Sequence, residues 1–132
     1  SLAGQLPWPA NGTIITKFVR QWNPKLKTTT ENPGIDIKGQ PGSPIKTILG
    51  GVVTTITYIR GYGTTIIIDH GGGFYTVYSH VANIQATVDR EVKNGEIIAY
   101  MGDSGSINGS KLHFEIWGKG QKLDPEKWLK KK

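Results

Sequence analysis

Residues 51–69 read GVVTTITYIRGYGTTIIID. The segment from Gly51 to Ile59 is rich in β-branched side chains, and so is the segment from Thr64 to Asp69. Val, Ile and Thr favour the extended strand, because a branched side chain packs well on a pleated surface. Gly61-Tyr62-Gly63, between the two segments, is typical of a turn. The stretch therefore predicts two consecutive β-strands joined by a turn.

Similar segments continue outward from this pair. Further strands are predicted at Phe74 to His80, Glu96 to Met101 and Leu112 to Trp117, with turns at Gly71 to Gly73, Asn94-Gly95 and Gly102 to Gly105. Residues 20–33 have little apolar content and are expected to form a surface loop. With 18 Gly and 7 Pro supplying many turns, the sequence predicts an all-β fold with short helices.

The clearest helix signal lies near the end of the sequence. Asp124-Pro125-Glu126 combines an N-cap residue, a proline at the first helical position and an acidic residue in the first turn. A short helix is therefore predicted through Trp128 and Leu129. His70, which precedes three glycines, is expected to make local hydrogen bonds within a turn.

Length and composition narrow the class of protein. The 132 residues suit a single domain over positions 1–132, and the start at Ser1 rather than Met suggests a fragment of a longer protein. The absence of cysteine excludes disulfides and thiolate metal sites. No run of about 18 apolar residues predicts a membrane span. The net charge of +6 favours anionic partners, but without a nucleic-acid-binding motif we do not expect nucleic acid among them.

Strand parity brings several polar side chains to one face. In residues 111–117, Leu112, Phe114 and Ile116 form an apolar face, so the alternate side chains point the other way. The same alternation buries Ile35 and Ile37. The polar residues that share the opposite faces, or one side of the strand ending at His80, are Asp36, Lys38, Tyr78, His80, Lys111, His113 and Glu115. They predict a polar groove, although ordinary solvated side chains would give the same pattern.

The order of short motifs along the chain resembles the lysostaphin/LytM-type metallopeptidase domain over nearly its whole length. The motifs are LPWP at 6–9, GIDI at 34–37, GSPI at 42–45, GVV at 51–53, GYG at 61–63, DHG at 69–71, YSHV at 78–81, LHFEI at 112–116, and Asp124-Pro125 with Trp128-Leu129. The resemblance implies a small antiparallel β domain with a long groove across one sheet.

The same resemblance assigns zinc chemistry to particular positions. In that family a His-x-x-x-Asp pair and the second His of a His-x-His pair bind zinc, while two further histidines act around the zinc-bound water. Carried over, Asp36 and His113 fill two ligand positions and His80 fills one catalytic position. Asn32 stands at the first zinc-binding His, and Lys111 stands at the first His of the His-x-His pair.

These two departures imply that the metal and the catalysis are lost. Catalytic zinc usually takes three protein ligands, and Asp36 and His113 supply two. The amide oxygen of Asn32 is a poor replacement for an imidazole nitrogen. The Lys111 ammonium has no lone pair with which to bind metal or accept a proton. We therefore expect no zinc and no peptidase activity, with Asp36, His80, Lys111 and His113 vestigial.

Among LytM-type domains, the altered motif Asn32-Pro33-Gly34-Ile35-Asp36 resembles the EnvC-like murein hydrolase activators. That likeness implies a non-catalytic domain that binds and activates peptidoglycan hydrolases, cell-wall amidases above all, during wall remodelling and division. It also implies a bacterial periplasm or cell envelope, with peptidoglycan as a second expected partner. The expected binding groove comprises Asn32, Asp36, Lys38, Tyr78, His80, Lys111, His113 and Glu115.

Two other functions stay open at this point. An active zinc endopeptidase would need a third ligand from Glu31 or His80, and would cleave peptidoglycan cross-links. A passive peptidoglycan-binding module would need only the basic surface.

Overall fold

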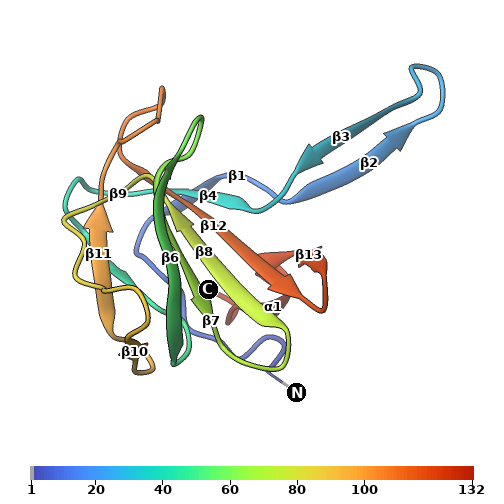
Figure 1. The fold of residues 1–132 in the computed structure, drawn as a ribbon. Helices are drawn as coiled ribbons and strands as arrows, with labels where there is room; N and C mark the ends of the chain where they lie inside the picture. Colours follow the sequence, from blue (N-terminus) through green and yellow to red (C-terminus); the bar gives the residue numbers. More distant parts are fainter. Residues whose placement is uncertain (1) are drawn as a thin grey trace.

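The computed structural model describes residues 2–132 and is built almost entirely of antiparallel β-structure (Figure 1). In chain order the elements are β1 (Thr13–Thr16), β2 (Val19–Asn23), β3 (Thr28–Asn32), β4 (Ile35–Lys38), β5 (Pro44–Lys46), β6 (Gly51–Ile59), β7 (Gly63–Asp69), β8 (Phe74–Ser79), β9 (Val81–Ala82), β10 (Glu91–Val92), β11 (Ile97–Met101), β12 (Lys111–Gly118), β13 (Gln121–Leu123) and α1 (Pro125–Trp128). The predicted fold class, an all-β domain with a short helix, is confirmed.

One large sheet organises the described residues. Its strands follow the order β1-β4-β12-β8-β7-β6-β10, and β13 adds to β12. A smaller sheet, β5-β11-β9, lies beside it, and β2 and β3 form a separate two-stranded sheet. Strand β12 therefore lies between β4 and β8, although β4 and β12 are far apart in the sequence.

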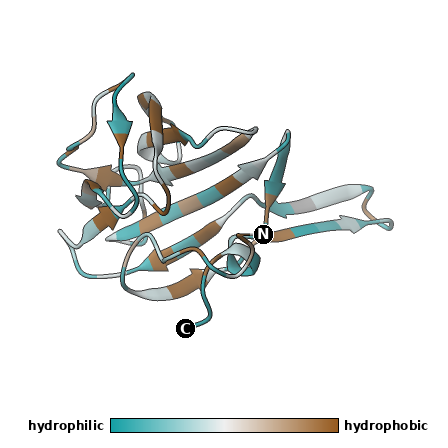
Figure 2. Ribbon diagram, turned by 90° about the horizontal axis from the view of Figure 1, so that it is seen from below, coloured by the Kyte–Doolittle hydropathy of each residue, from teal (hydrophilic) through white to brown (hydrophobic). Residues whose placement is uncertain are grey.

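The core forms where the apolar faces of the strands meet. Along the strands of Figure 2, apolar and polar residues alternate, as expected when one face of a sheet is covered. Ile35, Ile37, Leu112, Phe114 and Ile116 are all fully buried, as strand parity predicts. Their burial fixes the opposite faces of β4 and β12 as the polar ones.

The short helix is confirmed together with its cap. The side chain of Asp124 accepts a hydrogen bond from the backbone N–H of Glu126, and Pro125 opens the helix. Within residues 2–132, no helix has the length and apolar character needed to cross a membrane.

The expectation of a loop over residues 20–33 is wrong. β2 and β3 pair in register from Val19↔Asn32 to Asn23↔Thr28 and project from the body as an arm (Figure 1). Low apolar content suggested a loop, but the two segments pair as a hairpin, which can form outside a core because the strands hydrogen-bond to each other. The side chain of Asn23 fixes the tip, because its Oδ1 accepts from the backbone N–H groups of Lys25 and Leu26.

Candidate functional site

Strand register brings the polar residues of β4 and β12 together. His113 lies directly opposite Asp36, and Lys111 lies opposite Lys38. Directly opposed residues in an antiparallel pair share a face of the sheet. Glu115 lies on that same face, two residues along β12 from His113. The predicted gathering of these side chains is therefore present.

The four central side chains form a continuous charge network. Lys111 Nζ donates to Asp36 Oδ2 at 3.3 Å, and His113 Nδ1 lies 2.7 Å from Asp36 Oδ1. His113 Nε2 lies 2.7 Å from Glu115 Oε2, and Trp117 Nε1 donates to Glu115 Oε1 at 2.8 Å. Each carboxylate therefore receives two donors.

This network is buried, whereas ordinary solvated side chains were the alternative explanation of the sequence pattern. The exposed fractions are 8% for Asp36, 9% for Lys111, 3% for His113 and 6% for Glu115. Two cations and two anions balance one another in the chain of contacts. Buried charges persist only when they are paired and hydrogen-bonded, and this arrangement meets both conditions.

The two carboxylates fix the protonation state of His113. A carboxylate only accepts hydrogen bonds, so a histidine that contacts one at each ring nitrogen must carry a proton on both. Burial alone would lower the pKa of His113, but its hydrogen bonds to Asp36 and Glu115 and their negative charges raise the pKa instead. Burial would likewise raise the pKa of Asp36, but His113 and Lys111 lower it. The network is thus an imidazolium held between two carboxylates.

A pH dependence of stability follows from the raised pKa of His113. A raised folded-state pKa contributes stability that is fully present below the unfolded value of 6.5 and is lost as pH rises through the folded-state pKa. The difference in free energy of unfolding between the wild type and His113→Gln should therefore shrink as pH rises above 6.5. Urea denaturation at a series of pH values measures it. A difference that stays constant or grows with pH would contradict the assigned imidazolium.

Two further rings cover this network. The Tyr62 ring lies 4.8 Å from the His113 ring, centroid to centroid, and the His80 ring lies 6.4 Å from Tyr62. Burial raises the pKa of Tyr62, and the charges of Glu115 and Asp36 add to the effect. Sequence reasoning treated Tyr62 as a turn residue and Trp117 as the end of a strand. Strand alternation could have placed Trp117 on the polar face, because it lies two residues beyond Glu115 on the same strand.

His80 differs from His113 in charge state. Its Nδ1 lies 2.7 Å from the backbone carbonyl of Ser104, an acceptor, so Nδ1 carries the proton. Burial lowers the pKa of His80, and the positive charges of Lys111 and His113 lower it further. The site therefore combines a cationic His113 with a neutral His80, whose Nε2 keeps its lone pair.

The placement of Tyr78 in the groove is wrong. Tyr78 is fully buried on the core face, 5.3 Å from the Phe114 ring, and its hydroxyl lies 2.8 Å from Thr76 Oγ1. Its neighbour Ser79, opposite His113, is the residue on the polar side. Strand alternation does not carry from Tyr78 to His80, because β8 ends at Ser79 and His80 adopts a left-handed φ of 63°.

The remaining predicted groove residues occupy the margins. Lys38 is exposed at the end of β4. Asn32 is half-buried at the base of the hairpin, where its Nδ2 donates to the backbone carbonyl of Lys17 at 2.7 Å. Asn32 thus fastens the arm to the chain that leaves β1.

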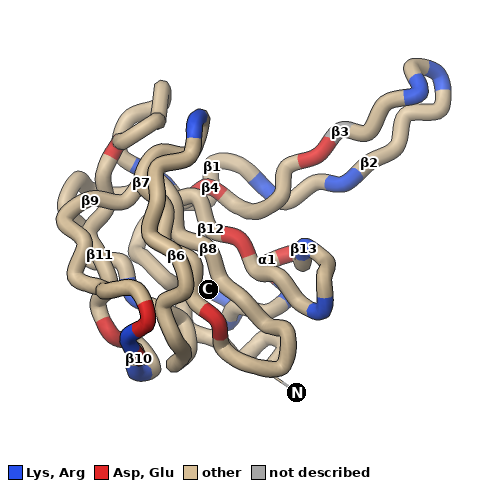
Figure 3. Tube along the Cα trace, viewed as in Figure 1, with Lys and Arg blue, Asp and Glu red and all other residues tan. Residues whose placement is uncertain are grey.

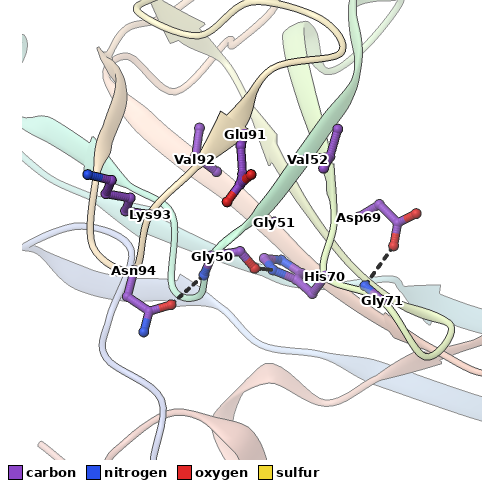
Figure 4. A pocket seen from close by; sticks show the side chains of 10 residues that line it. All are labelled: Gly50, Gly51, Val52, Asp69, His70, Gly71, Glu91, Val92, Lys93 and Asn94. Atoms are coloured by element: carbon purple, nitrogen blue, oxygen red, sulfur yellow. Dashed lines mark hydrogen bonds between the residues drawn. The ribbon is translucent and has the colours of Figure 1, made fainter.

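His70 lies at the other end of β7, away from the charge network. The expected local hydrogen bond is present, since the backbone N–H of His70 donates to the carbonyl of Phe74 at 2.8 Å. The ring also reaches more distant groups, because its Nδ1 lies 2.9 Å from the carbonyl of Gly50 and its Nε2 lies 2.7 Å from Thr76 Oγ1. His70 lines a cleft of about 570 Å³. Figure 4 shows its lining residues, among which Asn94 accepts from the backbone N–H of Gly50 and Asp69 accepts from that of Gly71. The ring therefore connects the residue before β6 to β8.

The residues of the network do not fit the zinc ion that a LytM-type domain implies. A histidine binds zinc through a deprotonated ring nitrogen, and both nitrogens of His113 face carboxylates. The Lys111 ammonium already contacts Asp36, the other expected ligand. Among residues 2–132, no group of three or more His, Cys, Asp and Glu is arranged to hold a metal.

Comparison with known proteins shows the family to which this fold belongs. Residues 30–125 match peptidase family M23, so the chain belongs to that family. A solved structure described as a zinc containing peptidase from Vibrio cholerae aligns with a TM-score of 0.81 and 25% identity, over 91% of this chain and 38% of that one. The metallopeptidase fold is thus shared.

Two relatives of similar sequence have names that do not describe them as peptidases. The chain is 42% identical over 123 residues to the outer membrane antigenic lipoprotein B of Haemophilus influenzae, covering 92% of this chain and 28% of the relative. It is 30% identical over 126 residues to the murein hydrolase activator EnvC of Escherichia coli, covering 96% of this chain and 29% of the relative. The chain therefore spans under a third of the length of these two relatives.

Proposed function

We propose that this domain is a non-catalytic activator that binds a peptidoglycan hydrolase, with a cell-wall amidase as the partner, at the bacterial cell envelope. The observation that carries the proposal is the charge network itself. Both nitrogens of His113 are occupied by carboxylates, and Lys111 adds an ammonium beside Asp36. A site closed in this way is suited to hold a surface in shape rather than to polarise a peptide bond.

The relatives support the cellular setting. EnvC of Escherichia coli is named a murein hydrolase activator, and the Haemophilus relative is named an outer membrane lipoprotein. By analogy we place this domain in the periplasm, where peptidoglycan is remodelled during division. Zinc is not part of the proposed mechanism.

The surface around the buried network would make the contact with the partner. Lys38 is exposed at one end of the network, and the half-buried Trp117 lies at the other. Buried charges in the centre are compensated internally, so binding strength would come from side chains at the margin. Charge reversal at Lys111 is unsuitable as a test, because it would place a second carboxylate against Asp36 in the buried network.

An activity assay with dye-labelled sacculi tests the proposal. The domain alone should release no dye, and a cell-wall amidase from the same bacterium should release it faster when the domain is added. Lys38→Glu should weaken the stimulation by about tenfold, the scale of a single interface hot spot. Lys93→Glu, an equal charge change on the exposed β10 end, is the matched control and should leave the stimulation unchanged.

Other outcomes would select the alternatives. Release by the domain alone, abolished by a chelator, would restore the zinc endopeptidase with a third ligand from Glu31 or His80. Cosedimentation with sacculi without any stimulation would favour a passive peptidoglycan-binding module.

A further inference from the structure

The β2–β3 arm projects from the body of the domain (Figure 1). Neither of its strands pairs with a third strand among residues 2–132, so both outer edges present backbone hydrogen-bonding groups. A two-stranded hairpin of this kind contributes little to a core and is costly to leave exposed. Trp22 and Leu26 nevertheless expose 58% and 70% of their surface on this arm.

Register shows which face of the arm carries the side chains of interest. Arg20 pairs with Glu31, and Trp22 pairs with Thr29, so these four side chains share one face. Arg20 and Glu31 also line a cleft of about 350 Å³ that is completed by Phe18 and by Gly120 to Lys122. The face that carries Trp22 is therefore the face that opens into this cleft, between the arm and the β12–β13 turn.

The cleft adjoins the charge network. Lys122, which lines the cleft, lies opposite Trp117 in the β12–β13 pair, and the Trp117 indole donates to Glu115 of the network. A chain bound beside the network could thus continue through the cleft and along the arm without leaving the surface.

Charge on these elements is mainly positive. Figure 3 shows basic residues on β2, at the tip of the arm and at the β12–β13 turn. The arm carries Arg20, Lys25 and Lys27 against the single acidic residue Glu31, and Lys119 of the β12–β13 turn and Lys122 of β13 add to them. The surface complements an acidic ligand.

We infer that the β2–β3 arm and the β12–β13 turn together dock an acidic, extended protein segment that has an apolar anchor against Trp22. Open strand edges favour a peptide, because a peptide backbone can add to them as a further strand. A lipid surface would use the tip of the arm and leave the cleft empty. The inference deepens the proposed function by naming the chemistry of the segment that the hydrolase would offer.

A binding experiment on the intact domain tests this surface. The probe is a glutamate–tyrosine copolymer, with a lysine–tyrosine copolymer as the opposite-charge control. The domain should bind the acidic copolymer with an affinity that falls as salt rises. Arg20→Glu combined with Lys122→Glu should weaken binding about tenfold or more, and Trp22→Ala should do the same.

The matched control is Arg90→Glu combined with Lys93→Glu. These exposed residues lie directly before and after β10, and their replacement changes the net charge as much as Arg20→Glu combined with Lys122→Glu does. Equal weakening by both double variants, or no effect of Trp22→Ala, would overturn the inference, because net charge alone would then explain binding. Binding to phosphatidylglycerol vesicles or sacculi with the same variant dependence, and not to the copolymer, would also overturn it.

The amidase assay separates this inference from the proposed function. If Lys38→Glu abolishes stimulation while the arm variants have full stimulation and full copolymer binding, the arm inference fails and the activator role stands. If no amidase responds but the copolymer binds through the arm, the activator role fails and the docking surface stands.

Discussion

Replacing Asp36 with alanine should lower the free energy of unfolding by about 3–5 kcal/mol, the cost of breaking a buried ion pair by removing one partner. Asp36 accepts from both Lys111 and His113, so its removal leaves one of them unpaired and the other with a single carboxylate. Urea denaturation measures the loss. Asp103→Ala, which removes an exposed carboxylate, is the matched control and should change stability by less than about 0.5 kcal/mol.

A double-mutant cycle tests directly whether Asp36 and Lys111 interact in the network. The double variant Asp36→Ala/Lys111→Met should lose less stability than the sum of the losses of the two single variants, because methionine leaves no ammonium buried alone. The coupling should lie in the range of roughly 0.5–3 kcal/mol that interacting residues show. Strict additivity would mean that Lys111 and Asp36 do not interact, and the network would have to be abandoned.

Gly63→Ala should be the other severe substitution, with a loss of about 2–5 kcal/mol. Gly63 has a φ of 69°, and an added Cβ would lie 2.0 Å from the backbone oxygen of Ser104. The left-handed conformation costs a residue with a side chain roughly 1–2 kcal/mol, and overpacking typically adds about 1–3 kcal/mol. Because Ser104 also holds His80, the cover of the site should loosen with it.

Gly61→Ala separates the two costs. Gly61 has a similar φ of 86°, but an added Cβ would meet nothing within 4 Å. It should therefore cost only the roughly 1–2 kcal/mol of the backbone conformation. Equal losses at the two glycines, measured by urea denaturation, would show that the contact between Gly63 and Ser104 is not a tight one.

The buried network bears on how a metallopeptidase fold can serve another purpose. A zinc site holds several strands in place through one multivalent cation. Here Lys111, Asp36, His113 and Glu115 connect β4 to β12 with charges of their own. The proposed activator would in this way keep a rigid surface around the site, which a partner needs for recognition, without the metal.

Much of the fold could be predicted from local pattern. The β-branched segments around Gly51 to Asp69 and the alternation in residues 111–117 determined the strands and their buried faces. Alternation is a property of any extended chain, so Ile35, Phe114 and Asp36 could be assigned to faces before any partner was known. The motifs along the chain determined the family, and Asn32 and Lys111 were visible as departures from it.

Other features depended on contacts between distant segments. The sequence by itself determined which polar residues lie opposite the apolar faces in residues 35–38 and 111–117. Only the tertiary structure decided that His113 is a buried imidazolium, because that state requires Asp36 from β4 beside Glu115 of β12. It also decided that Tyr78 belongs to the core and that residues 19–32 form an arm. Strand ends, left-handed residues such as His80 and backbone-only pairing leave little trace in hydrophobic pattern, since each is fixed by register and packing rather than by local side-chain character.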